Sequence, residues 1–372
     1  MRSPRRIPIV CAAAGLSVAL SLAATAGADD LTPQEKALIP LAKAEGAVIT
    51  MSSLFQDKTA RALEAAFRKR YGLGDDFKYT NIRKGTGPTV STARQEIKAG
   101  RITFDAIMVA GAGFFAGAAK QGAFLKLDSG QWKYHEKNAK KAHAFFQYPW
   151  FVIGSAYSFQ PVWNAACPGM ENFNVTSYND ILAPSLKGKT IVSDVTKSTS
   201  YSTTTLGLEQ SGFDIHAMWK KLKAQDPLVA FRTEPKMQMV INCERPIDMW
   251  NLVGRAFQAI EKEPSLAKKL RWGTYKEGQV LLNRQLAVMK GAPHPNAGKL
   301  FVEFLLSKDG VDTMTEREAS AIISYREGYK PPESVAQYMM DLSKVKILGV
   351  KDEVEAYKQF KGMRAAWRKV FQ

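Results

Sequence analysis

Three short loops in the first part of the chain are rich in glycine and hydroxyl groups, and each follows a predicted strand. The carboxyl ends of parallel strands meet at one edge of a sheet, where ligands commonly bind. Amides and hydroxyls at helix starts favour anions there, because the helix dipole adds partial positive charge. The loops therefore predict a cradle for an anion. The candidates are Ser52, Ser53, Arg83, Gly85, Thr86, Gly87 and Gly111.

Arg83 is the most direct candidate for a charged partner of such an anion, because a guanidinium binds a carboxylate or phosphate through two parallel hydrogen bonds. Lys84 adds a second positive charge. Simpler interpretations stay open, since glycine and serine are ordinary turn residues and both cations fit a solvated loop. The joint placement of the three loops favours the anion site.

A second set of polar residues lies in the other half of the chain. Residues 197–205 carry seven serine and threonine hydroxyls at the start of a predicted helix, whereas a helix N-cap needs only one. A later strand ends in an aromatic residue and an amide, which would serve as a lid, although a core tryptophan beside a surface asparagine would give the same pattern. The candidates in this half are Ser200, Tyr201, Ser202, Trp250 and Asn251.

The sequence contains no recognisable set of catalytic or metal-binding residues. None of its four histidines stands at metal-ligand spacing to another histidine or a carboxylate in a known motif. A Gly-x-Ser-x-Gly elbow, a phosphate-binding Gly-Lys-Ser/Thr loop, a dinucleotide-binding glycine motif and a Cys-x-x-Cys pair are also absent. We therefore expect no enzyme activity, no cofactor and no metal site.

The amino terminus has the three parts of a secretory signal peptide. Three arginines precede an apolar stretch at residues 7–24, and small residues then lead to a cleavage site after Ala28. The alternative is an uncleaved membrane anchor, since the apolar stretch approaches the length that spans a bilayer. The small residues within the stretch favour cleavage, so residues 1–28 are expected to be removed from an exported protein.

The charge balance favours anionic partners. Lysine and arginine total 52 against 35 aspartate and glutamate, a net charge of +17. The signal peptide takes three arginines and no acid, which leaves 49 − 35 = +14 for the mature chain. An exported protein without a zinc spacing, an aromatic RNA-binding strand or a basic helix motif is not expected to bind nucleic acid.

Two cysteines remain in the mature chain, because Cys11 leaves with the signal peptide. In an oxidising compartment, Cys167 and Cys243 are expected to form a disulfide. Two separate buried thiols are the alternative that the sequence leaves open.

Strand and helix patterns alternate along the mature chain, which predicts an α/β fold with parallel sheets, and the length of 372 residues fits two domains. The expected strands are residues 47–51, 77–82, 104–109, 189–192, 246–250 and 279–289. The expected helices are residues 31–45, 59–71, 90–99, 113–121, 201–210, 215–224, 236–241 and 296–306. The lysine-rich tail after Leu348 predicts a final helix, which we place over the first domain.

Five segments carry a family pattern, and the last of them is the most specific. They are residues 46–52, 99–109, 119–125, 186–191 and 292–308. In these segments the chain resembles the extracellular solute-binding proteins of ABC importers, in the group that includes ferric-ion and small-anion binders. The resemblance covers nearly all of the mature chain. It implies a two-lobe periplasmic-binding-protein fold, similar to type II, whose crossing strands act as a hinge.

This resemblance also implies boundaries and partners. The first lobe would be residues 29–153 plus 290–372, the second residues 154–289, and the disulfide would lie within the second lobe. The crossing strands would run near residues 150–158 and 283–289. A periplasmic monomer that delivers its ligand to an ABC permease in the inner membrane is expected.

One departure from the family bears on the ligand. Ferric-ion binders of the family use a tyrosine pair after a late strand and a histidine after the first strand. Here the late strand ends at Trp250 and Asn251 and the first at Ser52 and Ser53, so Tyr201 is the single phenol on offer. We therefore expect a small organic anion, such as a carboxylate, phosphonate or sugar phosphate.

Several other functions stay open. A ferric ion or ferric chelate is the main alternative ligand, and a polyamine, a thiamine-like cation or a neutral solute is a further one. A sensor module that presents its ligand to a membrane receptor would need the same closing cleft. An exported enzyme could use that cleft as well.

Overall fold

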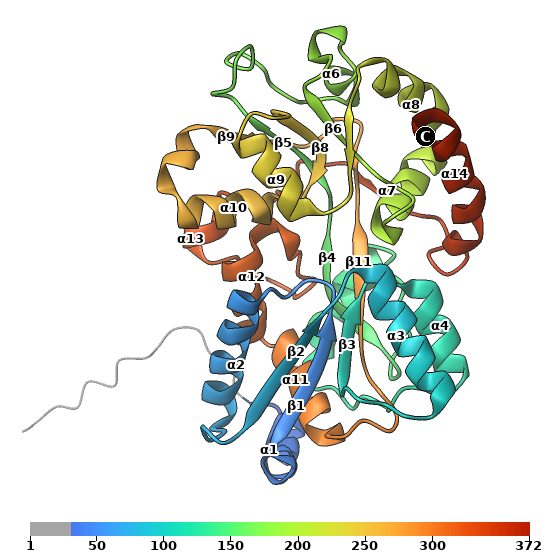
Figure 1. Ribbon diagram of the computed structural model, residues 1–372. Coiled ribbons are helices and arrows are strands. Elements are labelled where there is room, and N and C mark those ends of the chain that lie inside the picture. The colour runs from blue at the N-terminus through green and yellow to red at the C-terminus, as the bar shows by residue number, and fades with distance from the viewer. Residues whose placement is uncertain (1–30) are drawn as a thin grey trace, which may run out of the picture.

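The computed structural model describes residues 31–372, so the predicted signal peptide lies outside the described residues. Two five-stranded sheets, each covered by helices, form two lobes that lie one above the other in Figure 1. The predicted two-lobe α/β architecture is confirmed. None of the helices in the described part of the chain is long and apolar enough to cross a membrane.

The first lobe is built on a sheet with the strand order β2–β1–β3–β11–β4. Strands β1 (Ala47–Ser52), β2 (Lys78–Arg83) and β3 (Ala106–Val109) run parallel, as predicted. Strand β11 (Leu282–Val288) is antiparallel to β3 and to β4 (Val152–Tyr157). The helices of this lobe are α1 (Pro33–Glu45), α2 (Asp57–Tyr71), α3 (Thr86–Ala99), α4 (Ala112–Lys120), α5 (Glu136–Lys141), α11 (Pro295–Leu306) and α12 (Lys308–Glu318).

The second lobe is built on a sheet with the strand order β7–β6–β8–β5–β9. Strands β6 (Thr190–Ser193), β7 (Leu228–Ala230) and β8 (Ile247–Asn251) run parallel. Strand β5 (Gln160–Asn164) is antiparallel to β8 and to β9 (Leu270–Trp272). The helices here are α6 (Tyr178–Ile181), α7 (Thr199–Gln210), α8 (Ile215–Ala224), α9 (Thr233–Ile241) and α10 (Val253–Lys262), and a short helix, α13 (Glu333–Ala336), contacts α12.

Direct connections join the lobes. Strand β4 of the first sheet is separated from β5 of the second sheet by two residues, Ser158 and Phe159. Strand β11 returns the chain to the first sheet, and the short β10 (Gln279–Val280) before it pairs with β12 (Ile347–Leu348). Two thin connections of this kind are typical of a hinge. The residue boundaries of the lobes stay a prediction.

The loops that were predicted to bind an anion lie at the boundary between the lobes. Helices that precede β1 and β3 end at Gly46 and Gly100, whose left-handed φ angles of 69° and 65° suit glycine. Because β1, β2 and β3 then run parallel, their carboxyl ends all point toward the second lobe (Figure 1).

The final helix, α14 (Ala356–Phe371), packs against α7 and α8 of the second lobe (Figure 1). Phe360 joins Leu206 of α7 in one apolar cluster, and Trp367 is buried. The prediction that this helix lies over the first domain is wrong, because its apolar face meets the helices of the second lobe.

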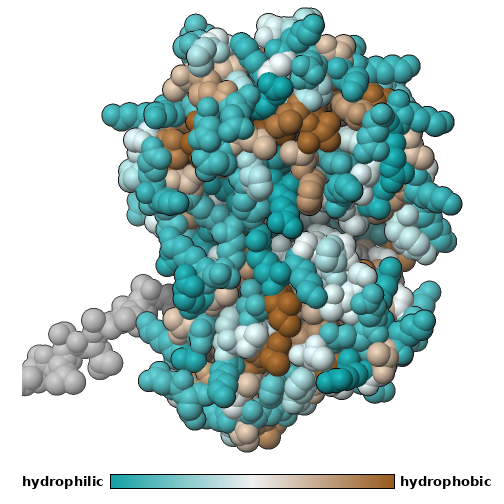
Figure 2. All heavy atoms as spheres, viewed as in Figure 1, coloured by the Kyte–Doolittle hydropathy of each residue, from teal (hydrophilic) through white to brown (hydrophobic). Residues whose placement is uncertain are grey.

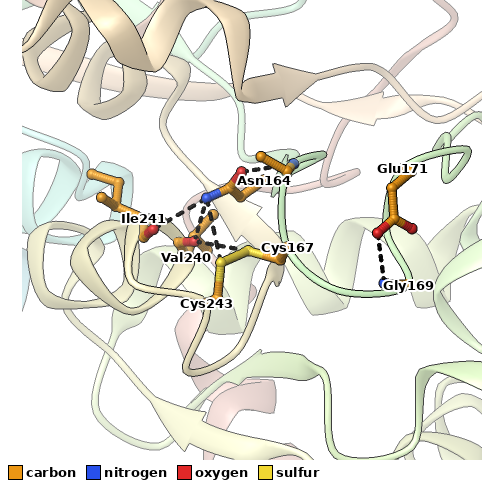
Figure 3. The surroundings of a disulfide bond; sticks show 8 residues. Asn164, Cys167, Gly169, Glu171, Val240, Ile241 and Cys243 are labelled. Atoms are coloured by element: carbon orange, nitrogen blue, oxygen red, sulfur yellow. Dashed lines mark hydrogen bonds between the residues drawn. A yellow bond between two sulfur atoms is a disulfide. The ribbon is translucent and has the colours of Figure 1, made fainter.

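Cys167 and Cys243 form a disulfide within the second lobe, with their Cα atoms 5.6 Å apart (Figure 3). Beside it, the side-chain amide of Asn164 donates to the carbonyl of Ile241 at 3.1 Å. The bond joins residues separated by 76 positions. By the chain-entropy model, a loop of that size stabilises the fold by about 4–5 kcal/mol. Neither cysteine lies on a strand that joins the lobes.

Candidate ligand-binding site

A cavity of about 560 Å³ lies between the two lobes. Its walls come from α3 and the loop before α4 in the first lobe, from the start of α7 in the second lobe, and from residues 281–283 at the start of β11. The remaining wall is the C-terminal segment from Val350 to Arg368. A volume of this size suits a small organic molecule.

Four of the predicted residues line this cavity, and they come from both lobes: Thr86, Gly87, Gly111 and Ser200. The Thr86 and Ser200 hydroxyl oxygens lie 3.4 Å apart and so connect α3 to α7 across the boundary. The Ser200 hydroxyl also lies 2.7 Å from the hydroxyl of Tyr157 on β4. The starts of these two helices therefore meet at the cavity.

The helix start at α3 keeps free donors. Its N-cap is Gly85, and no side chain caps the helix there. The amides of Thr86 and Gly87 in the first turn, which form no hydrogen bond within residues 31–372, therefore remain available to a ligand, whereas Pro88 has none. In the neighbouring loop the amide of Gly111 is already used, because it donates to the side-chain oxygen of Gln285 at 2.9 Å.

The other predicted residues of the first lobe are bonded within the protein. Ser52 is buried, and its hydroxyl accepts a hydrogen bond from the amide of Leu54 at 3.1 Å. The amide of Ser53 donates to the carbonyl of Met108 at 3.4 Å. These serines therefore shape the turn after β1 and do not line the cavity.

Arg83 forms an ion pair across the lobe boundary. Its guanidinium lies 2.5 Å from a carboxylate oxygen of Glu234 on α9, and it does not line the cavity. Burial of Glu234 would raise its pKa, but the guanidinium groups of Arg255 and Arg83 outweigh this and lower the pKa to about 2. Glu234 therefore stays ionised at neutral pH and competes with any ligand for Arg83.

The aromatic residues that were predicted as a lid belong to the core of the second lobe. Tyr201 and Trp250 are both buried, and their rings stack with centroids 6.2 Å apart. The ammonium of Lys236 lies 4.9 Å from the centre of the Tyr201 ring and pairs with Asp248 at 2.9 Å. Both members of that pair are fully buried. Neither aromatic ring lines the cavity.

The last two predicted residues serve as structural connections. The side-chain amide of Asn251 donates to Asp248 at 2.7 Å and to the carbonyl of Thr233 at 3.1 Å. The Ser202 hydroxyl donates to the carbonyl of Val195 at 2.8 Å and accepts a hydrogen bond from Arg364 at 3.0 Å. Ser202 thus supports a side chain of the cavity wall without lining the cavity itself.

Four cations line the cavity, and sequence reasoning missed all of them as site residues. Lys361, Arg364 and Arg368 lie on α14 and are called the C-terminal cations below; Arg94 lies on α3. Among residues 31–372, none of the four forms an ion pair with an acidic side chain. The C-terminal cations are spaced three and four residues apart, which places them on one face of α14. This spacing is the one sequence signal that could have identified them as site residues.

One acidic side chain, Glu353, lines the same cavity. Burial raises the pKa of Glu353 to about 7, even though hydrogen bonds from Asn283 and from the amide of Phe145 lower it. Burial and the neighbouring Arg368 lower the pKa of Arg364, and the attraction of Asp194 opposes them in part. A guanidinium keeps its charge at neutral pH. The cavity is therefore strongly positive. On the face seen in Figure 2, hydrophilic side chains predominate over both lobes, and hydrophobic ones form small separate patches.

Within the described range, no group of three or more histidine, cysteine, aspartate or glutamate side chains is arranged to hold a metal ion.

Comparison with known proteins assigns the fold. The model of a bacterial extracellular solute-binding protein family matches residues 62–340, more than half of the chain. No curated protein sequence matches significantly.

Solved structures of low sequence identity share the architecture. A substrate-binding protein of an ABC transporter from Agrobacterium tumefaciens superposes with a TM-score of 0.70 at 16% identity, over 88% of this chain and 94% of that one. AfuA from Actinobacillus pleuropneumoniae, with fructose-6-phosphate bound, superposes with a TM-score of 0.69 at 17% identity, over 87% of this chain and 98% of that one. Iron-bound HitA from Pseudomonas aeruginosa superposes with a TM-score of 0.67 at 16% identity, over 88% of this chain and 99% of that one.

Proposed function

The chain belongs to the family of bacterial extracellular solute-binding proteins, and we propose that it captures a small organic anion for an ABC importer by closing its two lobes around the ligand. The supporting observation is the charge of the cavity between the lobes. Four cations that form no ion pair in residues 31–372 line it, against one glutamate whose pKa is about 7. A carboxylate, phosphonate or phosphate ester would be held there by charge-assisted hydrogen bonds.

Hinge closure is supported by three polar contacts that cross the lobe boundary at or beside the cavity; the buried Arg255–Glu318 pair, at 3.1 Å, also crosses the boundary and is not one of them. Thr86 meets Ser200 at the cavity, and Arg83 and Gln56 both contact Glu234 beside it. These are polar and partly exposed contacts, which can form and break at low cost. Closure excludes water from the cavity, and the lower local dielectric strengthens each hydrogen bond to the ligand.

Membership of the family supports a cellular role in import. Export to the periplasm and delivery to a permease of the inner membrane are part of this proposal, because one structural relative is a substrate-binding protein of an ABC transporter. Structural relatives hold ligands as different as iron and fructose-6-phosphate, so the ligand must be found by experiment.

A thermal-shift screen of residues 29–372 tests the function. The panel holds citrate, malate, a phosphonate, glucose 6-phosphate and fructose 6-phosphate, with spermidine, ferric citrate and ferric ion as contrasting ligands. A ligand at a thousand times its dissociation constant stabilises the fold by about 4 kcal/mol, which raises the melting temperature by several degrees. We expect a shift with at least one organic anion.

Other outcomes contradict the proposal in distinct ways. If the melting temperature rises with ferric ion alone, or with ferric citrate but not with citrate, the result would support an iron-binding function instead. A shift with spermidine alone would contradict the anion class. An unchanged melting temperature with every ligand of the panel would contradict capture of these anions. Chemical turnover of a bound ligand over hours would indicate an enzyme.

A further inference from the structure

The C-terminal segment is a wall of the cavity that the family pattern does not include. The family model matches residues 62–340, and α14 lies beyond them. Yet eight of the cavity-lining residues come from residues 350–368.

Packing against the second lobe holds α14 in place. Ala356 and Phe360 form an apolar cluster with Leu206 of α7, and Trp367 is buried one turn before the helix ends. The Arg364 guanidinium donates to Ser202 on α7 at 3.0 Å. The helix is therefore a fixed support for charged side chains and not a loose tail.

The residues just before α14 reach the first lobe. The Glu353 carboxylate accepts hydrogen bonds from the side-chain amide of Asn283 at 2.8 Å and from the amide of Phe145 at 3.4 Å. At the start of α4, a Cβ atom on Gly113 would stand 2.8 Å from the carbonyl oxygen of Val354, closer than a side chain allows. The segment thus contacts both lobes beside the cavity.

Charge on this segment is uneven. Lys358 pairs with Glu355, the N-cap residue of α14, and does not line the cavity. The C-terminal cations form no ion pair within residues 31–372, although Asp194 attracts Arg364 at longer range. Arg94 of the first lobe lines the same cavity. A ligand with one negative charge would leave most of this positive charge uncompensated.

We infer that α14 is the specificity-determining element of this site, in which the C-terminal cations favour ligands that carry two or more negative charges over ligands of similar size that carry one. The inference rests on the proposed function and narrows its substrate class. Each added negative charge gains attraction from several cations that line one cavity, and closure of the lobes would strengthen this attraction by excluding water.

Two ligand pairs test the preference at pH 7.5 by titration calorimetry on residues 29–372. They are 6-phosphogluconate against gluconate, and glucose 6-phosphate against glucuronate. We expect the wild-type protein to bind a phosphorylated member at least about tenfold more tightly than its singly charged counterpart, a difference worth one charge-assisted hydrogen bond.

The matched variants are Lys361→Gln and Lys369→Gln. Both remove one lysine charge from an exposed position of α14, but only Lys361 lines the cavity. Neither side chain makes a hydrogen bond or ion pair in the described residues, so neither variant should disturb packing. Lys361→Gln should reduce the preference for the phosphorylated ligand by about threefold or more, and Lys369→Gln should leave it unchanged.

The outcomes separate the inference from the function. Equal affinity for both members of each pair, equal effects of the two lysine variants, or binding of neither phosphorylated probe would overturn the role assigned to α14. The proposed function would survive each of these results, provided that the broader panel gives an organic-anion hit. If no organic anion of the panel raises the melting temperature, the proposed function itself would be contradicted.

Discussion

Two groups of cations lie near the lobe boundary, and they differ in whether an acidic side chain already pairs with them. Arg83 pairs with Glu234, and Lys236, whose ammonium lies beside the Tyr201 ring, pairs with Asp248. The C-terminal cations, by contrast, form no ion pair in residues 31–372 and line the cavity.

This difference shows what makes a charged residue available to a ligand. An arginine beside an ionised carboxylate has its charge largely compensated before any ligand arrives, whereas an arginine without an ion pair gains more from an anion, above all once closure excludes water. Residue type and proximity to the cleft are therefore weaker guides than the partners that the fold provides.

Trp250→Ala should give the largest effect, because it removes a buried core side chain. Trp250 is 2% exposed. We expect the free energy of unfolding to fall by about 3–5 kcal/mol in denaturant titrations. Trp250→Phe, which keeps much of the volume, should lose less. Weaker ligand binding with unchanged stability would instead make Trp250 the lid that the sequence predicts.

Arg364→Glu should weaken binding of the panel's anion by about 3 kcal/mol or more, a factor of at least about 100. The change removes a donor and places a negative charge in the cavity. Titration calorimetry measures it, and Arg364→Lys serves as the control that keeps the charge. If charge reversal left the affinity intact, the C-terminal cations would not belong to the site.

Affinity should depend on pH through Glu353. Since burial raises its pKa to about 7, the carboxyl gains a proton as the pH falls from 8 to 6 and the cavity loses its negative charge. Binding of gluconate, whose own charge is constant in this range, should tighten by about fivefold, or about 1 kcal/mol. Glu353→Gln keeps an oxygen acceptor for Asn283 and should flatten the profile; a slope that persists in this variant would assign it to another group.

Arg83 should give the smallest effect. The sequence alone predicts that Arg83→Ala weakens an anionic ligand by about 1.5–3 kcal/mol if the guanidinium contacts it. Because the structure pairs Arg83 with Glu234 at a partly exposed site, we expect a loss below about 1 kcal/mol.

The double variant Arg83→Gln/Glu234→Gln is the control for this ion pair. It should bind the ligand about as well as the single Arg83 variant. A loss of tenfold or more in the Arg83 variant alone would restore Arg83 to the ligand site.

The fold could be predicted because its signals are local. Short apolar runs such as β1 and β3, and the glycines that end the helices before them, specify strands and their order along the chain. The antiparallel insertion of β11 between β3 and β4 was not predicted. It depends on a pairing between residues more than 120 positions apart, which no local pattern records.

The candidate site was predicted less well for the same reason. Thr86, Gly87, Gly111 and Ser200 reach the cavity because they follow strands or begin helices that the pattern already located. The C-terminal cations were missed, because their role depends on where α14 packs.

The sequence by itself determined the alternation of strands and helices and the excess of positive charge, since periodicity and composition carry these directly. The family resemblance implied the two lobes, and the disulfide was an expectation that the structure confirms. Only the tertiary structure decided which cations keep their charge available. Glu234 and Arg83 are 151 positions apart, and α14 meets the second lobe through packing of its apolar face. Charge compensation is a property of distance in space, and the order of residues along the chain does not contain it.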